Sequence, residues 1–263
     1  MQMLLADSCF NITHESFKGD LDDIIKKAIE QDVGYYFCPS SKENEIKDIL
    51  DLSSDYKNRI ICSVGIHPHN ASELKPDTIK NLEPFLNNEQ VKSVGEIGLD
   101  YFRNFQSPEI QIKCFIAFLQ LAADKKYPVF LHHREAFEDF YPILKDYIDN
   151  IPQSIVHCFT GSKYELKKFL DLGLFIGITG WICDPKRGAN LKELIKYIPP
   201  DRLIIETDAP YLVPKNLKIK PKNNRNEPYY LPHILEEISL HIGRDKEKIA
   251  LETTSNFKKL FRI

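Results

Sequence analysis

The sequence predicts a (β/α)8 barrel, and three observations lead to this fold class. Short apolar runs, typical of strands buried on both faces of a parallel sheet, recur along the 263 residues. Amphipathic segments with helical periodicity separate these runs. Histidines and carboxylates follow several of the runs directly, and the carboxyl ends of the strands are where such a barrel carries its active site.

Eight strands are expected from the apolar runs. They cover residues 3–6, 34–38, 60–64, 91–96, 129–132, 154–157, 174–178 and 203–206. The runs 129–132 and 154–157 are joined by an amphipathic segment, 135–147, which predicts neighbouring parallel strands with a right-handed helical crossover.

The clearest helix begins at Ser107, because proline and an acidic residue follow it at the first helical positions. Its apolar residues recur with helical spacing and predict the face that packs on the barrel. They are Ile112, Phe115, Ile116, Leu119, Ala122 and Ala123.

A doubly wound open sheet is the main alternative fold. It usually has a glycine-rich phosphate-binding turn after its first strand, and no such turn follows Ala6. At 43% hydrophobic residues the chain can bury a large core, so we expect residues 1–263 to form a single TIM-barrel domain.

Composition limits the function classes. The formal net charge of −3 excludes a cationic coat protein for nucleic acid, so a polyanion would have to meet a local basic patch or a metal ion. The six cysteines lack paired spacing, which predicts reduced thiols and a cytoplasmic location. We expect no signal peptide, because the apolar N-terminal run is short and has no basic segment before it, and no transmembrane segment.

Metal-ligand side chains recur at the predicted strand ends. His132 and His157 end two strands, Glu96 ends another, and His67 and Asp208 each follow a strand directly. Such a cluster would be costly to bury without a metal ion, so the pattern predicts a divalent cation bound at this edge. A packed or hydrogen-bonded histidine is the usual alternative for any one of these residues.

Five sequence blocks resemble the TatD family of metal-dependent deoxyribonucleases, and the resemblance covers nearly the whole chain. The blocks are Gly65-Ile-His67-Pro-His69, Gly95-Glu96-Ile-Gly-Leu-Asp100-Tyr, Leu131-His132-His-Arg134, His157-Cys-Phe-Thr160-Gly161 and Glu206-Thr-Asp208-Ala-Pro-Tyr-Leu. The resemblance implies a metallo-dependent hydrolase barrel with 3′→5′ exonuclease activity on single-stranded DNA, with RNA as a second candidate substrate. It also implies a role in DNA repair or degradation.

One departure from the family pattern concerns the first strand. Family members commonly begin with Asp-x-His-x-His, whose histidines bind a first metal ion, whereas Cys9 and Asn11 stand at these positions here. Glu96, His132, His157 and Asp208 match the remaining metal-site positions. Loss of the two histidines favours Mg²⁺ or Mn²⁺ over Zn²⁺, which stays a candidate. Cys9 is either a metal ligand or, as we expect, a buried thiol.

A bound cation would lower the pKa of water and stabilise the charge that develops on the phosphate. The expected catalytic residues are Asp208, which would orient or deprotonate the water, Glu96, and His67. His67 has two other interpretations, a hydrogen bond to the leaving oxygen and a cap for its own loop.

Substrate binding requires cations along the phosphates and flat side chains for the bases. Arg103 and Arg134 follow two of the ligand-bearing strands. A basic segment, 215–225, follows Asp208 and has no acidic residue. The expected contacts to single-stranded DNA, or to RNA, are Arg103, Arg134, Arg225, Lys222 and His69.

Two other functions fit the same residues. A barrel hydrolase acting on amide or ester bonds of a small molecule or of aminoacyl-tRNA would use a similar metal site. It would usually retain the first-strand histidines, and it often carries a modified lysine where Glu96 stands. A degenerate barrel that only binds nucleic acid or a protein would not be expected to retain Glu96, His132, His157 and Asp208 together.

Overall fold

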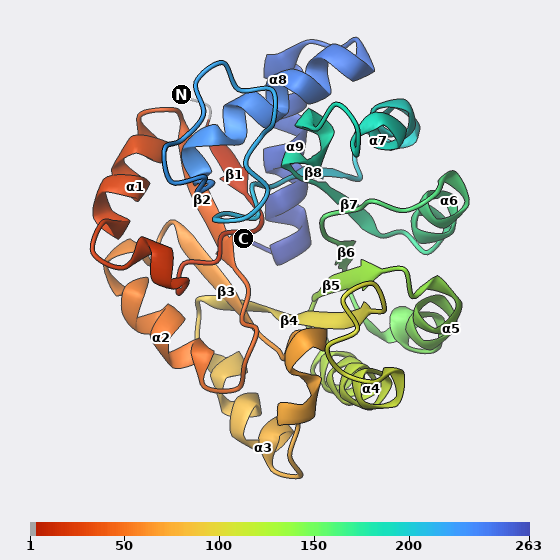
Figure 1. Ribbon diagram of the computed structural model, residues 1–263. Helices are drawn as coiled ribbons and strands as arrows, with labels where there is room; N and C mark the ends of the chain where they lie inside the picture. The colour runs from red at the N-terminus through yellow and green to blue at the C-terminus, as the bar shows by residue number, and fades with distance from the viewer. Residues whose placement is uncertain (1–3) are drawn as a thin grey trace.

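The computed structural model describes residues 4–263 and confirms the (β/α)8 barrel. Eight parallel strands form one sheet in sequence order, and the helices lie around the outside (Figure 1). The strands are β1 Leu5–Asp7, β2 Val33–Cys38, β3 Ile60–Val64, β4 Val91–Asp100, β5 Val129–Arg134, β6 Ser154–Val156, β7 Phe175–Ile178 and β8 Leu203–Ile205. The helices are α1 Leu21–Ile29, α2 Glu45–Leu52, α3 Thr78–Leu82, α4 Pro108–Lys125, α5 Phe137–Tyr147, α6 Lys163–Asp171, α7 Ala189–Leu194, α8 Leu231–Ile242 and α9 Lys246–Phe261.

All eight expected runs contain a strand, although the expected start of the first, Met3, lies outside the described residues. The largest error concerns β4, which continues to Asp100 instead of ending at Glu96. Its last four residues pair with β5, from Ile97 opposite Leu131 to Asp100 opposite Arg134. Glu96 therefore lies inside a strand, and the carboxylate at the strand end is that of Asp100.

Strands β1 and β8 close the barrel through a few hydrogen bonds instead of a regular ladder. The backbone N–H and the hydroxyl of Ser8 both donate to the carbonyl of Ile205, at 3.3 and 2.7 Å. Just beyond the strands, the N–H of Asp208 donates to the carbonyl of Cys9 at 2.9 Å. This last bond fixes the backbone of Asp208 next to the end of β1.

Helix α9 covers the amino end of the barrel. Its Asn256 side chain donates to the carbonyls of Pro200 and Leu203, and its Thr254 hydroxyl donates to the carbonyl of Leu4, all at or before the starts of strands. Phe261 stacks on Phe37 inside the barrel, with ring centroids 4.2 Å apart. Since this end is covered, the carboxyl ends of the strands form the open end.

Helix α4 matches its sequence signals at its N-terminus and on most of its face. Ser107 precedes it as the N-cap residue and Pro108 takes the first helical position. Phe115, Leu119 and the alanines of the expected face are buried, but the expectation for Ile116 was wrong, since this side chain is 37% exposed. In the part of the chain that the structure describes, no helix is long and apolar enough to span a bilayer.

Candidate metal centre

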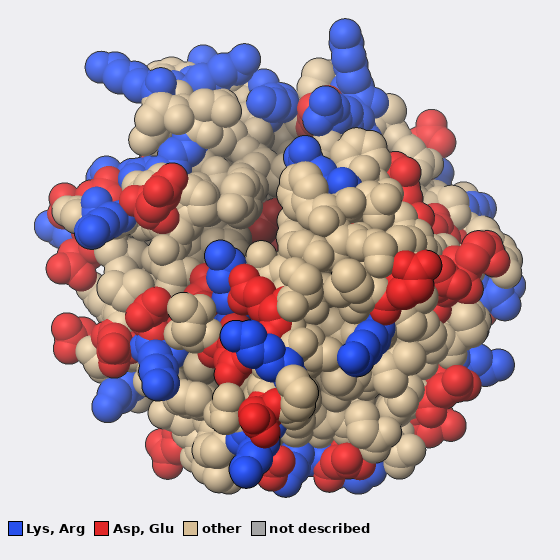
Figure 2. All heavy atoms as spheres, turned by 60° about the horizontal axis from the view of Figure 1, so that its bottom comes forward, with Lys and Arg blue, Asp and Glu red and all other residues tan. Residues whose placement is uncertain are grey.

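The structure brings the expected metal-site residues to one cleft at the carboxyl ends of the strands. Glu96 lies in β4, His132 in β5, His157 directly after β6 and Asp208 after β8. All four line a cleft of about 970 Å³. One face of the molecule is visibly hollowed, and lysine and arginine side chains gather on the raised parts beside the hollow (Figure 2).

Glu96 is the centre of this arrangement. Its Oε1 atom lies 2.7 Å from Nδ1 of His132, 2.8 Å from Nε2 of His157 and 3.3 Å from Nε2 of His67. Burial alone would raise the pKa of Glu96, but His157 and His67 beside it hold the pKa well below its usual range. The carboxylate is therefore charged and surrounded by imidazole nitrogens.

This donor set fits a divalent cation. A carboxylate oxygen has about two lone-pair sites, fewer than the three nitrogens that surround Oε1 of Glu96. Ligand atoms of His67, Glu96 and His132 lie within 4.8 Å of one another. Burial lowers the pKa of His67 to about 4, so its ring is neutral at pH 7 and offers a lone pair as a metal ligand does.

His67 caps its own loop and also faces Glu96. Its Nδ1 accepts the backbone N–H of His69 at 3.1 Å and so caps the 3-10 turn Pro68–Glu73. Its Nε2 points to Glu96, which adds a third histidine to the cluster. Because the cap fixes the ring, His67 presents its second nitrogen to the cleft.

Asp208 lies apart from this tight cluster, although it lines the same cleft. Its Oδ1 atom accepts hydrogen bonds from Nδ2 of Asn11 at 3.1 Å and from Sγ of Cys9 at 3.4 Å. Burial raises the pKa of Asp208 to about 6, and the charges of Glu96 and Glu206 act in the same direction. The two residues that stand at the expected histidine positions thus donate hydrogen bonds to a carboxylate.

Asp100 is a site residue that the sequence interpretation missed. Its buried Oδ2 atom lies 2.8 Å from Nε2 of His69 and 3.2 Å from Nε2 of His132. Burial raises its pKa, but the hydrogen bonds from His132 and His69 outweigh this effect, so the pKa lies below the usual range. The sequence signal was its place in the Gly95–Asp100 block, four residues after Glu96.

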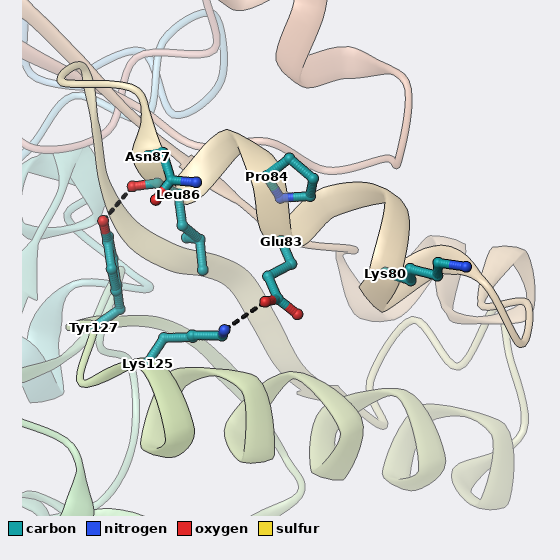
Figure 3. Close-up of a pocket in the computed structure, with 7 residues that line it drawn as sticks. All are labelled: Lys80, Glu83, Pro84, Leu86, Asn87, Lys125 and Tyr127. Carbon is teal, nitrogen blue, oxygen red and sulfur yellow. Dashed lines mark hydrogen bonds and ion pairs between the residues drawn. The ribbon is translucent and has the colours of Figure 1, made fainter.

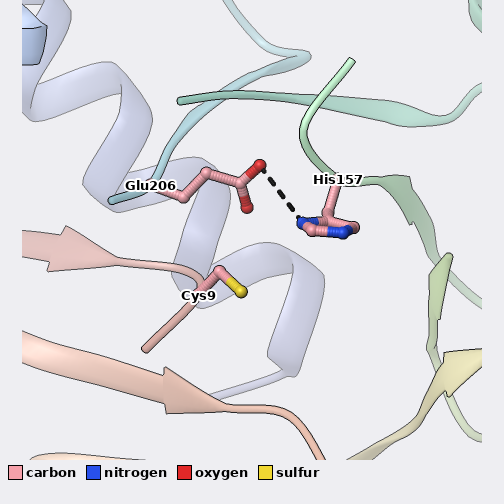
Figure 4. Close-up of side chains that lie close together, drawn as sticks. All are labelled: Cys9, His157 and Glu206. Atoms are coloured by element: carbon pink, nitrogen blue, oxygen red, sulfur yellow. Dashed lines mark ion pairs between the residues drawn. The ribbon is translucent and has the colours of Figure 1, made fainter. Parts of the chain in front are cut away.

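Glu206 is the second residue that was missed. It forms a buried cluster with Cys9 and His157, and their ligand atoms lie within 4.8 Å of one another (Figure 4). The Oε1 atom of Glu206 lies 3.6 Å from Nδ1 of His157, on the opposite side of the ring from Glu96. Two carboxylates therefore follow strand β8: Glu206, which faces His157, and Asp208, which lines the cleft.

His133 takes the structural role that alternation along the strand predicts. Its ring packs among Phe137, Phe140 and Phe169, with centroids 5.0 to 6.2 Å away. Its Nε2 atom lies 3.9 Å from Glu165. Neither nitrogen is in contact with Glu96.

The rim of the cleft is cationic and aromatic. Arg103, Arg134, Arg187 and Lys215 line it together with Trp181. The guanidinium of Arg134 lies 4.0 Å from the ring centroid of Phe102, and that of Arg187 lies 5.4 Å from the centroid of Trp181. These are flat surfaces and positive charges of the kind that bind bases and phosphates.

Two residues that were expected on the substrate path do not line this cleft. Arg225 pairs with Asp20 and Glu227, each at 2.7 Å, and its guanidinium lies 5.3 Å from the ring centroid of Phe17. Lys222 is exposed to solvent and does not line the cleft. Arg225 was expected to bind phosphate because of its basic sequence neighbours, whereas its guanidinium pairs with Glu227, two residues further on, and with Asp20 from a distant part of the chain.

A second hollow, of about 460 Å³, lies away from the strand ends (Figure 3). Lys125 of α4 pairs there with Glu83, and the hydroxyl of Tyr127 donates to the carbonyl of Leu86. The Lys125–Glu83 pair is more than one-third exposed on both sides. Lys125 and Glu83 thus pair with each other at the surface of this hollow.

Comparison with known proteins identifies the family. The family model described as TatD related DNase matches residues 6–262. The 3′-5′ ssDNA/RNA exonuclease TatD of Salmonella typhimurium is 41% identical over 98% of this chain and 99% of its own length. The protein of the same name from Erwinia tasmaniensis is 42% identical over 98% of this chain and its entire length. The crystal structure of YJJV, a TatD homologue from Escherichia coli, superposes with a TM-score of 0.89 at 26% identity and covers both chains completely. The match over nearly the whole length shows that this chain belongs to the TatD related DNase family.

Proposed function

We propose that this protein is a metal-dependent exonuclease that removes nucleotides from the 3′ end of single-stranded DNA, and that RNA is a second substrate. The observation that carries the proposal is the convergence of His67, His132 and His157 on Glu96 at the bottom of a cationic cleft. Relatives about 40% identical over the full chain, which bear the name 3′-5′ ssDNA/RNA exonuclease, support the substrate and the polarity.

Glu96, His132 and His157 would hold the cation, with His67 as a further ligand and Asp208 at its side. Three imidazoles and a carboxylate suit Mn²⁺ and Zn²⁺, whereas Mg²⁺ prefers oxygen ligands. We therefore favour Mn²⁺, and Mg²⁺ and Zn²⁺ are the other candidates. A bound cation supplies Lewis-acid stabilisation of phosphate charge and makes water a stronger acid.

Asp208 is the proposed proton acceptor for the attacking water. Asn11 and Cys9 both donate hydrogen bonds to its Oδ1 atom, and neither of them contacts Oδ2. A carboxylate with a raised pKa is a stronger base than an ordinary one. His132 is held on its other nitrogen by Asp100, which keeps Nδ1 directed at Glu96.

Arg103, Arg134 and His69 are the proposed phosphate contacts. Arg103 and Arg134 line the cleft and carry a planar fork of donors that matches phosphate oxygens. His69 lies against Asp100, and its ring is 4.7 Å from that of Phe105, whose side chain is 64% exposed. An exposed aromatic beside a phosphate contact suits the stacking of an unpaired base.

Two broader features complete the proposal. We treat residues 1–263 as a single hydrolase domain, which the continuous sheet from β1 to β8 supports. We also propose a cytoplasmic location, since all six cysteines are free thiols, and reduced thiols are typical of reducing compartments.

The test is digestion of single-stranded DNA labelled at the 3′ or the 5′ end, with Mn²⁺, Mg²⁺, Zn²⁺ or EDTA. We expect early release of the 3′ label with a divalent cation, none in EDTA, and none from Asp208→Ala or Glu96→Ala. A folded wild-type protein that cleaves amide or ester substrates but not DNA or RNA would overturn the proposal. Binding of DNA without cleavage under any metal would indicate a degenerate barrel instead.

A further inference from the structure

Glu206 is a buried carboxylate beside His157, and the proposed catalytic steps do not use it. Glu206 is 0% exposed and His157 is 4% exposed. The Oε1 atom of Glu206 accepts the backbone N–H of Cys158 and lies 3.6 Å from Nδ1 of His157. Among the described residues, neither Oε2 of Glu206 nor Nδ1 of His157 has a hydrogen-bond partner.

The two nitrogens of His157 therefore face two different carboxylates. Nε2 lies 2.8 Å from Glu96, inside the proposed cation site, and Nδ1 faces Glu206 behind it. A neutral imidazole carries a proton on only one nitrogen, and a metal ligand needs its lone pair on the nitrogen that faces the cation. The position of that single proton thus decides whether His157 can act as a ligand.

We propose that Glu206 is a positioning residue that holds the proton of His157 on Nδ1 and so keeps the Nε2 lone pair directed at the cation. Carboxylates that accept the second N–H of a metal-bound histidine commonly fix its orientation and increase its basicity. This inference rests on the proposed metal-dependent function, because it assigns Glu206 a role in cation affinity.

Gly177 in β7 provides the space that this carboxylate occupies. A Cβ atom at residue 177 would lie 2.5 Å from Oε1 and 2.9 Å from Cδ of Glu206, closer than real Cβ contacts. An alanine there would force the carboxylate to move without removing its charge. Gly177→Ala therefore perturbs the position of Glu206 and leaves the chemical groups of the site unchanged.

Cys9 is the third member of the cluster, but its thiol has another partner. Its Sγ atom lies 3.4 Å from Oδ1 of Asp208, to which it donates. The alternative is that Cys9, His157 and Glu206 bind a thiophilic cation of their own, since their ligand atoms lie within 4.8 Å of one another (Figure 4). The experiment must separate these two arrangements.

The first measurement is the proton position of His157 in the wild-type protein, from ¹⁵N chemical shifts and long-range couplings of the ring. The proposal expects a proton on Nδ1 both in the metal-free protein and with Mg²⁺ bound, and it expects Nε2 to be unprotonated when Mg²⁺ is bound. A proton on Nε2 alone, in either state, would overturn it. This measurement needs no variant, so it decides the assignment even if substitutions at residue 206 prevent folding.

The second measurement is calorimetric titration of Mn²⁺ into metal-free wild-type, Glu206→Gln and Gly177→Ala proteins. We expect the affinity for Mn²⁺ to fall by about 10- to 100-fold in Glu206→Gln. We expect the affinity to fall in Gly177→Ala as well. Glu83→Gln is the matched control, because Glu83 is a carboxylate that lies in the second hollow, away from the cation site (Figure 3). This variant should bind Mn²⁺ as tightly as the wild type does. Wild-type affinity in folded Glu206→Gln would contradict the proposal.

Cd²⁺ distinguishes the positioning role from a separate metal site. A Cd²⁺–thiolate absorption band that disappears in Cys9→Ser and in Glu206→Gln would show that the cluster binds its own cation, and would overturn the proposal. The absence of such a band supports it. A wild-type protein that binds no Mn²⁺ and cleaves no DNA would refute the proposed function, whereas the ¹⁵N measurement would still report on Glu206 and His157.

Discussion

Asn11 donates a hydrogen bond from Nδ2 to Oδ1 of Asp208 at 3.1 Å, and the thiol of Cys9 approaches the same oxygen at 3.4 Å. Neutral donors of the protein thus occupy one oxygen of this carboxylate. The relationship explains how a buried carboxylate is stabilised here without first-strand histidines.

We expect the wild-type chain to bind a single Mn²⁺ ion tightly, because Cys9 and Asn11 take up one side of Asp208. The double variant Cys9→His/Asn11→His should bind a second ion. Metal analysis of dialysed protein checks this, with Cys9→Ser/Asn11→Ala as the control that removes the donors without adding ligands. Two ions in the wild type would contradict the expectation.

Arg134→Ala should weaken binding of single-stranded DNA and leave the metal site intact. The salt dependence of binding, measured as log K against log salt in an inactive Asp208→Ala background, should decrease in slope by about 1 for a lost phosphate contact. Lys125→Ala is the control, since Lys125 pairs with Glu83 away from the cleft. An unchanged slope in Arg134→Ala would remove this residue from the substrate path.

Arg225→Ala should reduce stability, with little effect on DNA binding. The guanidinium pairs with Asp20 and Glu227, and its side chain is only 11% exposed. Hydrogen bonds between charged groups of this kind contribute about 1.5–3 kcal/mol when buried, and the 41% exposure of Asp20 reduces its share. We therefore expect a loss of about 1–2 kcal/mol in urea denaturation. Weaker DNA binding at unchanged stability would instead support the phosphate contact expected from the sequence.

Glu237 should make stability depend on pH. Burial raises the pKa of this carboxyl group, but hydrogen bonds from Lys192 and His241 outweigh burial and hold the pKa below its ordinary value of 4.5. The unfolded chain therefore binds a proton at a higher pH than the folded chain does. The stabilisation is complete above pH 4.5 and disappears as the pH falls through the lowered pKa.

Glu237→Gln tests this dependence. At neutral pH the variant should unfold more easily by about 1 kcal/mol, and the difference from the wild type should shrink in acid. Urea denaturation of both proteins at neutral and acid pH provides the measurement. A difference that is the same at both pH values would show that the carboxylate charge is not the cause.

The barrel could be predicted from the sequence because each strand is a short apolar run, and such a run can be recognised without knowing which other strands it pairs with. The sequence also predicted that Glu96, His132, His157 and Asp208 lie at one end of the barrel, where they line a single cleft, since parallel strands bring their carboxyl ends to one edge. It missed Asp100, because the extension of β4 depends on pairing with β5 and not on the residues of β4 alone. The pairing of Arg225 with Asp20 could not be predicted, because Asp20 is 205 positions away in the chain.

The most direct test of the central claim compares cation binding with cleavage in the same samples of wild-type and Glu96→Gln protein. Calorimetry would measure Mn²⁺ binding, and release of a 3′ label from single-stranded DNA would measure activity at each Mn²⁺ concentration. We expect the two curves of the wild type to rise together, and we expect Glu96→Gln to lose tight binding and cleavage. Cleavage that persists in Glu96→Gln, or in wild type treated with EDTA, would contradict a metal-dependent site centred on Glu96.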